Sequence, residues 1–164
     1  MIEAIANQLG YSVSQTREVW SPFSRALDAG VELNRLYTLE PERAEQTMAE
    51  FVGAAKEEIE ASAGGLIVYR LKGAEPKFAS PMEYGGHYLE VDRELLANGL
   101  EKSNVALVIE GGPETYLDFV SDLPATVFVW NSLETNMSLE EMEEMRSGKF
   151  IDLSQLKQEA CIGS

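Results

Sequence analysis

A pair of adjacent glycines, Gly111 and Gly112, stands between two acidic residues, Glu110 and Glu114, directly after an apolar run. Glycines let a ligand approach the main chain closely, and the first turn of a following helix has N–H groups without partners inside the helix. The two carboxylates oppose a bound phosphate, and the chain has neither a GxGxxG nor a GxxxxGK[ST] motif. We therefore expect this turn to contact a ligand through Glu110, Gly111, Gly112 and Glu114, and we expect no cofactor.

The only histidine, His87, lies in the longest irregular stretch of the chain, residues 72–87. Long loops in compact domains are often binding elements, and a single histidine can act as a general base near neutral pH. No second histidine or cysteine is close to it, and no GxSxG sequence supports a serine hydrolase. We expect the loop to cover the glycine turn, with His87 or Tyr84 as a polar contact and no bound metal. Whether the chain is an enzyme stays open.

Two buried strands hold the glycine turn between them. Val105 to Ile109 and Ala125 to Trp130 are apolar almost throughout, which is typical of strands covered on both faces. Pro113 suits the first turn of a helix, where Glu114 meets the positive end of the helix dipole. A helix between two strands makes them parallel. The glycine turn is then expected at the carboxyl end of a parallel strand, where open α/β sheets bind ligands.

Apolar spacing and turn residues divide the rest of the chain into elements. Helices are expected near residues 2–9, 19–30, 41–62, 92–100, 114–121 and 138–148, with Asp92 and Ser138 as caps. Strands are expected near 66–71, 88–91, 105–110, 125–130 and 150–153. The pattern predicts one domain, 1–164, of the α/β (or α+β) class. In it, an N-terminal helical segment, 1–62, packs on a mixed, partly parallel sheet within 63–164. The expected core residues are Phe51, Ile59, Ile67, Val68, Leu107, Ile109, Leu117, Val120, Val127 and Val129.

The segment Val108-Ile109-Glu110-Gly111, followed by a helix and a strand, resembles the start of a toprim domain. Toprim domains bind magnesium through this glutamate and a later Asp-x-Asp pair, and they serve primases, topoisomerases and nucleases. At the place of that pair this chain has Phe-Ile-Asp-Leu-Ser, with Asp152 followed by Ser154. The resemblance implies a strand, turn and helix around Glu110, whereas the incomplete ligand set does not favour phosphoryl transfer.

The net charge is −15, from 28 acidic and 13 basic residues, and both the 1–62 and the 63–164 segments are acidic. A field of this sign repels nucleic-acid phosphates and anionic membranes and attracts basic partners, although solubility and salt adaptation also account for such a charge. The N-terminus has no basic region followed by a long apolar stretch, and Cys161 is the only cysteine. We therefore expect a cytoplasmic protein without disulfides, membrane contact or direct nucleic-acid binding.

Two functions are consistent with these patterns. The leading hypothesis is a non-catalytic acidic binding protein, such as an adaptor, chaperone, immunity factor or nucleic-acid mimic, that recognises a basic protein partner. The alternative is a small-ligand-binding or enzymatic domain with its site over Gly111 and Gly112. A homodimer built mainly from residues 1–62 is also expected, because the apolar stripe of helix 41–62, with Met48 and Phe51, otherwise needs another cover.

Overall fold

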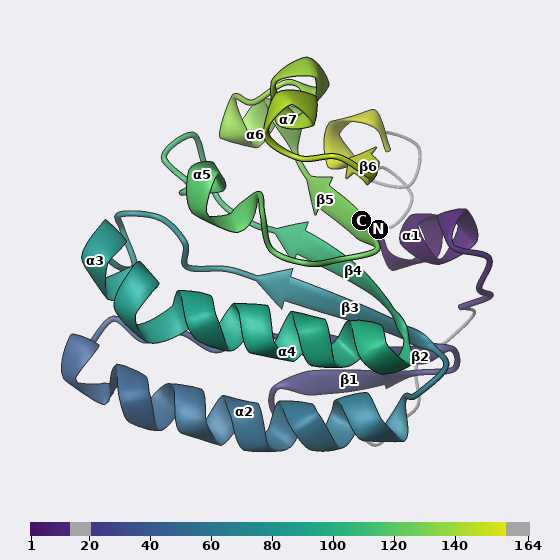
Figure 1. Ribbon diagram of the computed structural model, residues 1–164, viewed down its shortest axis with the longest axis horizontal. Coiled ribbons are helices and arrows are strands. Elements are labelled where there is room, and N and C mark those ends of the chain that lie inside the picture. Colours follow the sequence, from purple (N-terminus) through teal and green to yellow (C-terminus); the bar gives the residue numbers. More distant parts are fainter. Residues whose placement is uncertain (14–20, 157–164) are drawn as a thin grey trace.

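A six-stranded sheet forms the centre of the computed structural model, which describes residues 1–13 and 21–156. The strand order is β1-β2-β3-β4-β5-β6, so every strand pairs with its neighbours in sequence. The first two strands form an antiparallel hairpin, and the other four are added in parallel (Figure 1). The strands are β1 (Ser24–Leu27), β2 (Gly30–Asn34), β3 (Leu66–Leu71), β4 (Asn104–Ile109), β5 (Val127–Trp130) and β6 (Lys149–Asp152). The single α/β domain and its parallel 105–130 unit are confirmed.

Helices follow most of the strands. They are α1 (Ile2–Gln8), α2 (Ala44–Ala61), α3 (Pro81–Glu83), α4 (Leu89–Lys102), α5 (Leu117–Val120), α6 (Ser132–Thr135) and α7 (Leu139–Met145). Short turns extend them: the 3₁₀ turns η1 (Pro41–Arg43) and η3 (Leu153–Gln155), and the π-helical turn η2 (Tyr84–Tyr88). In the described ranges no helix is long and apolar enough to cross a membrane.

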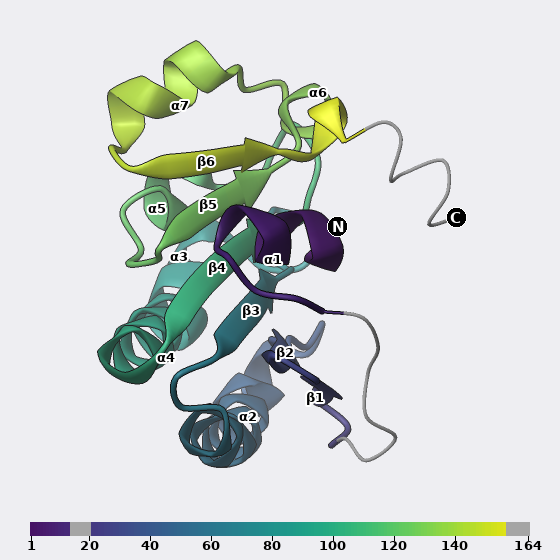
Figure 2. The ribbon, with the colours of Figure 1, turned by 90° about the vertical axis from the view of Figure 1, so that its right-hand side faces the viewer.

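The helices cover the two faces of the sheet unequally. Right-handed crossovers between sequential parallel strands place the connecting helices on one face, and Figure 2 shows α2, α4, α5 and α7 there, with α1 on the opposite face. Each face buries its own apolar cluster, one around Phe51, Tyr69 and Trp130 and the other around Ile5, Val68 and Val129. The N-terminal segment 1–62, expected to pack on the sheet as one helical layer, is therefore divided between the two faces: α1 covers one face, and α2 lies beside α4 on the other.

Several predicted elements are confirmed. The helices near 2–9 and 41–62 are present, β3 spans residues 66–71 as expected, and every residue of the expected core is buried. Ser138 begins α7 with a capping box, in which its side chain accepts a hydrogen bond from the Glu141 N–H and the Glu141 carboxylate accepts one from the Ser138 N–H. These elements were predictable because local signals and burial agree in them.

The helix expected over residues 19–30 is wrong, because the described part of that range forms the β1–β2 hairpin. A Cβ atom on Gly30 would lie 1.9 Å from the Leu66 carbonyl oxygen, so glycine allows β2 to pair closely with β3. The apolar spacing of Phe23 and Leu27 fits a helix equally well, and the tertiary pairing decides against it. Val19, which also supported this helix, lies outside the described residues, as does Cys161.

The strand expected over 88–91 is also wrong. A capping box between Ser80 and Glu83 begins α3, and helical structure continues through η2 and α4 to Lys102. Asp92 therefore lies inside a helix and is buried, rather than capping one. The helix expected from residue 114 begins only at Leu117, because the Thr115 N–H and hydroxyl both donate to the Gly112 carbonyl and close a turn first.

The apolar stripe of α2 is covered within the chain. Met48 and Phe51 are 3% and 0% exposed, and Phe51 packs edge-on against Phe23 and Tyr69. The homodimer expected from this stripe loses its basis, since no large apolar area of α2 is left to cover.

Candidate functional site

The glycine turn follows β4, and a loop follows β3, so both lie at the carboxyl ends of two neighbouring strands. Together they line a concavity of about 540 Å³, which is within the range of small-molecule sites. Its lining residues are Lys72, Glu75, Lys77, Phe78, Glu110, Gly111, Gly112, Pro113 and Glu134. Three of the predicted site residues, Glu110, Gly111 and Gly112, thus lie together with the loop that was expected to cover them.

Gly111 is held in a conformation that side chains rarely adopt, with φ at +152°. A Cβ atom here would lie 2.2 Å from the Thr115 hydroxyl oxygen and 2.7 Å from a Glu75 carboxylate oxygen. Gly112 has open space where its Cβ would be. The two glycines therefore differ: Gly111 lets Glu75 and Thr115 pack against the turn, whereas Gly112 leaves the concavity open to an incoming group.

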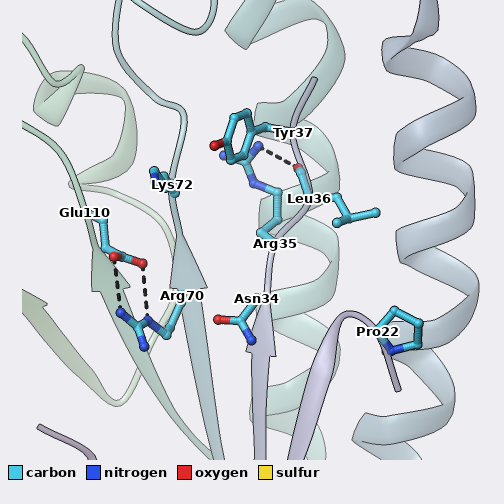
Figure 3. Close-up of a pocket in the computed structure, with 8 residues that line it drawn as sticks. All are labelled: Pro22, Asn34, Arg35, Leu36, Tyr37, Arg70, Lys72 and Glu110. Atoms are coloured by element: carbon cyan, nitrogen blue, oxygen red, sulfur yellow. Dashed lines mark hydrogen bonds and ion pairs between the residues drawn. The ribbon is translucent and has the colours of Figure 1, made fainter. Parts of the chain in front are cut away.

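Glu110 belongs to a charged row on the α1 side of the sheet. Its carboxylate accepts two hydrogen bonds from Arg70, at 3.1 and 3.2 Å (Figure 3). Arg70 also pairs with Glu32 at 3.3 Å. Arg25 closes the row with a 3.0 Å contact to Glu32. Desolvation lowers the pKa of Arg70, but the bonds to Glu110 and Glu32 outweigh it, and the net shift is upward. Arg70 thus holds the Glu110 carboxylate in place with two hydrogen bonds.

A second, smaller pocket of about 210 Å³ lies beside the concavity, over the ends of β2, β3 and β4. Its lining residues, drawn in Figure 3, are Pro22, Asn34, Arg35, Leu36, Tyr37, Arg70, Lys72 and Glu110. Lys72 and Glu110 line both hollows. Lys72 is exposed, and its ammonium lies 5.9 Å from the ring centre of Tyr37 and 5.7 Å from that of Phe78. The two hollows therefore share one exposed cation, Lys72, and one paired carboxylate, Glu110.

The remaining predicted site residues lie elsewhere. Tyr84 is fully buried and donates a 3.0 Å hydrogen bond to Asp92. His87 lies in η2, where it contacts the edge of Tyr88, and it lines neither hollow. Glu114 is exposed beyond Pro113 and does not line the concavity. The structure therefore does not bring these three side chains together with the glycine turn.

A buried polar cluster was missed by the sequence analysis. Arg35, just after β2, pairs with Asp92 of α4 at 3.1 Å, and neither side chain has exposed surface. Tyr69 and Tyr84 donate to the two oxygens of Asp92, and the guanidinium lies 4.8 Å from the Tyr88 ring centre. Burial and the charge of Asp92 raise the pKa of both donor tyrosines, so their hydroxyls stay protonated. Arg35, Tyr69 and Asp92 are far apart in the sequence, so no local sequence pattern predicts that they meet.

Acidic side chains gather on the helical face of the sheet. Helices α2, α4 and α7 carry 13 acidic and 3 basic residues, and of these acids only Asp92 is buried. The four glutamates of α7 are exposed, and α7 has no basic residue. Most cations of the described chain already pair with carboxylates of the same chain. The helical face therefore keeps a strong negative potential.

Among the described residues, no three His, Cys, Asp or Glu side chains are grouped so that they could hold a metal ion. Asp152, the toprim-like acid, instead accepts hydrogen bonds from Ser132 and Ser154.

Comparison of the chain with protein-family models, with curated proteins and with solved structures finds no match.

Proposed function

We propose that this protein is a non-catalytic binding protein that recognises a basic protein partner through its acidic helical face. The observation that carries the proposal is the uneven charge: 13 acidic against 3 basic residues on α2, α4 and α7. The opposite face, by contrast, pairs Arg25 and Arg70 with Glu32 and Glu110. A one-sided field steers an oppositely charged partner to that side and raises its association rate.

Affinity capture at varied ionic strength tests this proposal. The immobilised full chain is expected to retain proteins of basic isoelectric point at about 50 mM salt and to lose most of them by about 500 mM, because salt screens exposed charges. The double variant Glu140→Gln/Glu144→Gln removes two exposed charges of α7 and is expected to weaken capture several-fold. A captured set without basic proteins, or one that does not change with salt, would refute the proposal.

A matched control separates location from total charge. Glu3→Gln/Glu134→Gln changes the net charge by the same amount at two exposed positions outside α2, α4 and α7. This variant is expected to capture basic partners as the wild type does. Equal weakening by both pairs would mean that total charge, and not the helical face, decides binding.

The glycine turn supports a second candidate function, the binding of a small polar ligand. The observation in its favour is the concavity that holds Lys72, Glu110 and Gly112 together. Gly112→Val fills open space, so it is expected to block a ligand without disturbing the fold. A fragment screen by NMR is expected to shift the amides of Gly111 and Gly112 in the wild type but not in this variant. No shift at either glycine in the wild type would eliminate this function.

A further inference from the structure

A third hollow lies at the same edge of the molecule, where the starts of α2 and α3 come close to the segment before α5. Its volume is about 630 Å³. We call it the proline groove, after the three prolines in its lining, which consists of Leu39, Pro41, Pro76, Lys77, Phe78, Ala79, Ser80, Pro81, Glu83 and Tyr116. The groove shares Lys77 and Phe78 with the concavity beside the glycine turn but not Glu110 or the glycines.

One exposed apolar side chain lines the proline groove, and a second follows a lining residue in the sequence. Leu39, in the lining, is 66% exposed, and Met82, which follows the lining residue Pro81, is 85% exposed. Only a few large apolar side chains of the described chain are this accessible. Apolar residues grouped around a hollow and ringed by polar ones are typical of protein interaction sites, and methionine adapts to different partners.

The groove is held in shape before any partner arrives. The Tyr116 hydroxyl donates to the Ala79 carbonyl at 2.7 Å, and the Tyr116 N–H donates to the Ala74 carbonyl at 2.7 Å. The capping box of Ser80 and Glu83 fixes the other wall, and each proline fixes its own φ. A preformed groove spends little free energy on ordering when a partner binds.

Negative charge surrounds this apolar surface. Glu83 lines the groove, Glu40 lies between the lining residues Leu39 and Pro41, and Glu114 is two residues from Tyr116. Desolvation raises the pKa of Tyr116, and the fields of Glu114, Glu83 and Glu75 raise it further. Lys77 is the cation in the lining. The groove therefore complements an apolar side chain that has positive charges on either side of it.

We infer that the proline groove docks a short basic segment of the partner, with one large apolar side chain inserted beside Leu39, Phe78 and Tyr116. Lysines or arginines next to that side chain then lie near Glu40, Glu83 and Glu114. The inference rests on the proposed function, since it assumes a basic protein partner, and it adds where the partner is anchored and by which side chains. An apolar anchor in a preformed pocket supplies affinity and specificity, whereas exposed charges mainly supply speed of association.

Selection from a phage library of random peptides on the immobilised full chain tests this inference. The enriched peptides are expected to contain a leucine, methionine or aromatic residue flanked by lysine or arginine. The probe is then the most enriched peptide, made synthetically with a fluorescent label and titrated by anisotropy. Leu39→Asp places a charge in the groove and is expected to weaken the binding of this peptide at least ten-fold.

Leu133→Asp is the matched control, because Leu133 is 80% exposed on α6 and does not line the groove. It is expected to bind the peptide within two-fold of the wild type. Leu39→Ala, which removes the apolar side chain without adding a charge, provides a second groove variant if Leu39→Asp fails to fold, which circular dichroism will show, and it is expected to weaken binding of the peptide as well. Groove variants that bind the peptide as the wild type does would overturn the inference.

The failure of the inference is distinguishable from that of the proposed function. If basic peptides are enriched but only Glu140→Gln/Glu144→Gln weakens their binding, the partner binds the helical face and the groove assignment is wrong. If the enriched peptides carry no excess of basic residues, both are wrong. If the groove instead binds a second copy of the chain, sedimentation of the full chain alone would show a mass that rises with concentration. That result would also overturn the inference.

Discussion

Arg35 and Asp92 form an ion pair, 3.1 Å between Nε and Oδ1, in which neither side chain reaches solvent. The pair joins the end of β2 to the first turn of α4, and so ties the sheet to its helical layer. A buried charge whose partner is removed is left without compensation, which costs about 3–5 kcal/mol.

Asp92→Asn is therefore expected to lower the free energy of unfolding by about 3 kcal/mol. Urea denaturation followed by circular dichroism measures the change. Glu90→Gln removes an exposed partner of Arg93, 3.9 Å away, and serves as the control. It is expected to change stability by less than about 1 kcal/mol, because exposed pairs contribute little. If both variants cost the same, the buried pair contributes no more than an exposed one.

Gly111→Ala is expected to destabilise the fold by about 1–3 kcal/mol, because it combines a strained φ with the clash against Thr115 and Glu75. Gly112→Ala is the neighbouring control, since its Cβ meets nothing within 4 Å. Thermal unfolding of the two variants makes the comparison. Equal melting temperatures would show that the turn relaxes without cost and that the identity of Gly111 is not structural.

Arg146 stabilises the loop before β5. Its guanidinium donates to the carbonyl oxygens of Ser121, Leu123 and Ala125 and lies 5.1 Å from the ring centre of Phe128. Arg146→Met keeps the apolar stem but leaves these acceptors without a donor, at an expected cost of about 2 kcal/mol. Arg146→Lys keeps the charge without the planar fork and is expected to recover only part of the loss. Full recovery by lysine would show that charge alone is required.

The stability is also expected to depend on pH through Asp152. Burial opposes ionisation of this carboxyl, but hydrogen bonds from Ser132 and Ser154 outweigh it and lower the pKa. A pKa that is lower in the folded than in the unfolded state stabilises the fold at pH values above the unfolded value, about 3.9. This contribution is lost as the pH falls through the folded pKa.

Asp152→Asn removes this contribution. The difference in unfolding free energy between wild type and variant is expected to be largest above about pH 5 and to shrink towards about pH 2. Denaturation curves at several pH values measure it, and Asp118→Asn, at an exposed position on α5, is the control. A difference that stays constant over this range would show that the hydrogen bonds do not depend on the charge.

The sequence predicted those parts of the fold in which local and tertiary preferences agree. The apolar runs of β3, β4 and β5 have no stable alternative to burial, and the Ser138 capping box begins α7 as expected. The hairpin was missed because the pairing of Gly30 with Leu66, which decides it, is not a local property. The segment 88–91 was misread as a strand because Tyr88 and Val91 are of residue types that favour strands, and residues 81–87 were taken as irregular because the Ser80 capping box was overlooked.

Only the part of the candidate site that is contiguous in the sequence, directly after β4, was predicted. Glu110, Gly111 and Gly112 are contiguous, so a single turn places them. Lys72 and Arg70 come from β3 and its loop, and no local pattern indicates that they meet Glu110. The same holds for Arg35 and Asp92, which lie on different elements, and for the proline groove, whose walls come from three separate segments.

The sequential strand order also determines how the chain can assemble during synthesis. Each strand finds its partner already made when it leaves the ribosome, so the sheet can grow in one direction without waiting for later segments. Helix α1 and the residues just after it are the exception: Tyr11 accepts a hydrogen bond from Asn104, 93 positions later, and Ile5 is buried in a cluster with Val127 and Val129. Helix α1 is thus expected to dock only after β4 and β5 have been made, and until then the apolar face that it covers stays exposed.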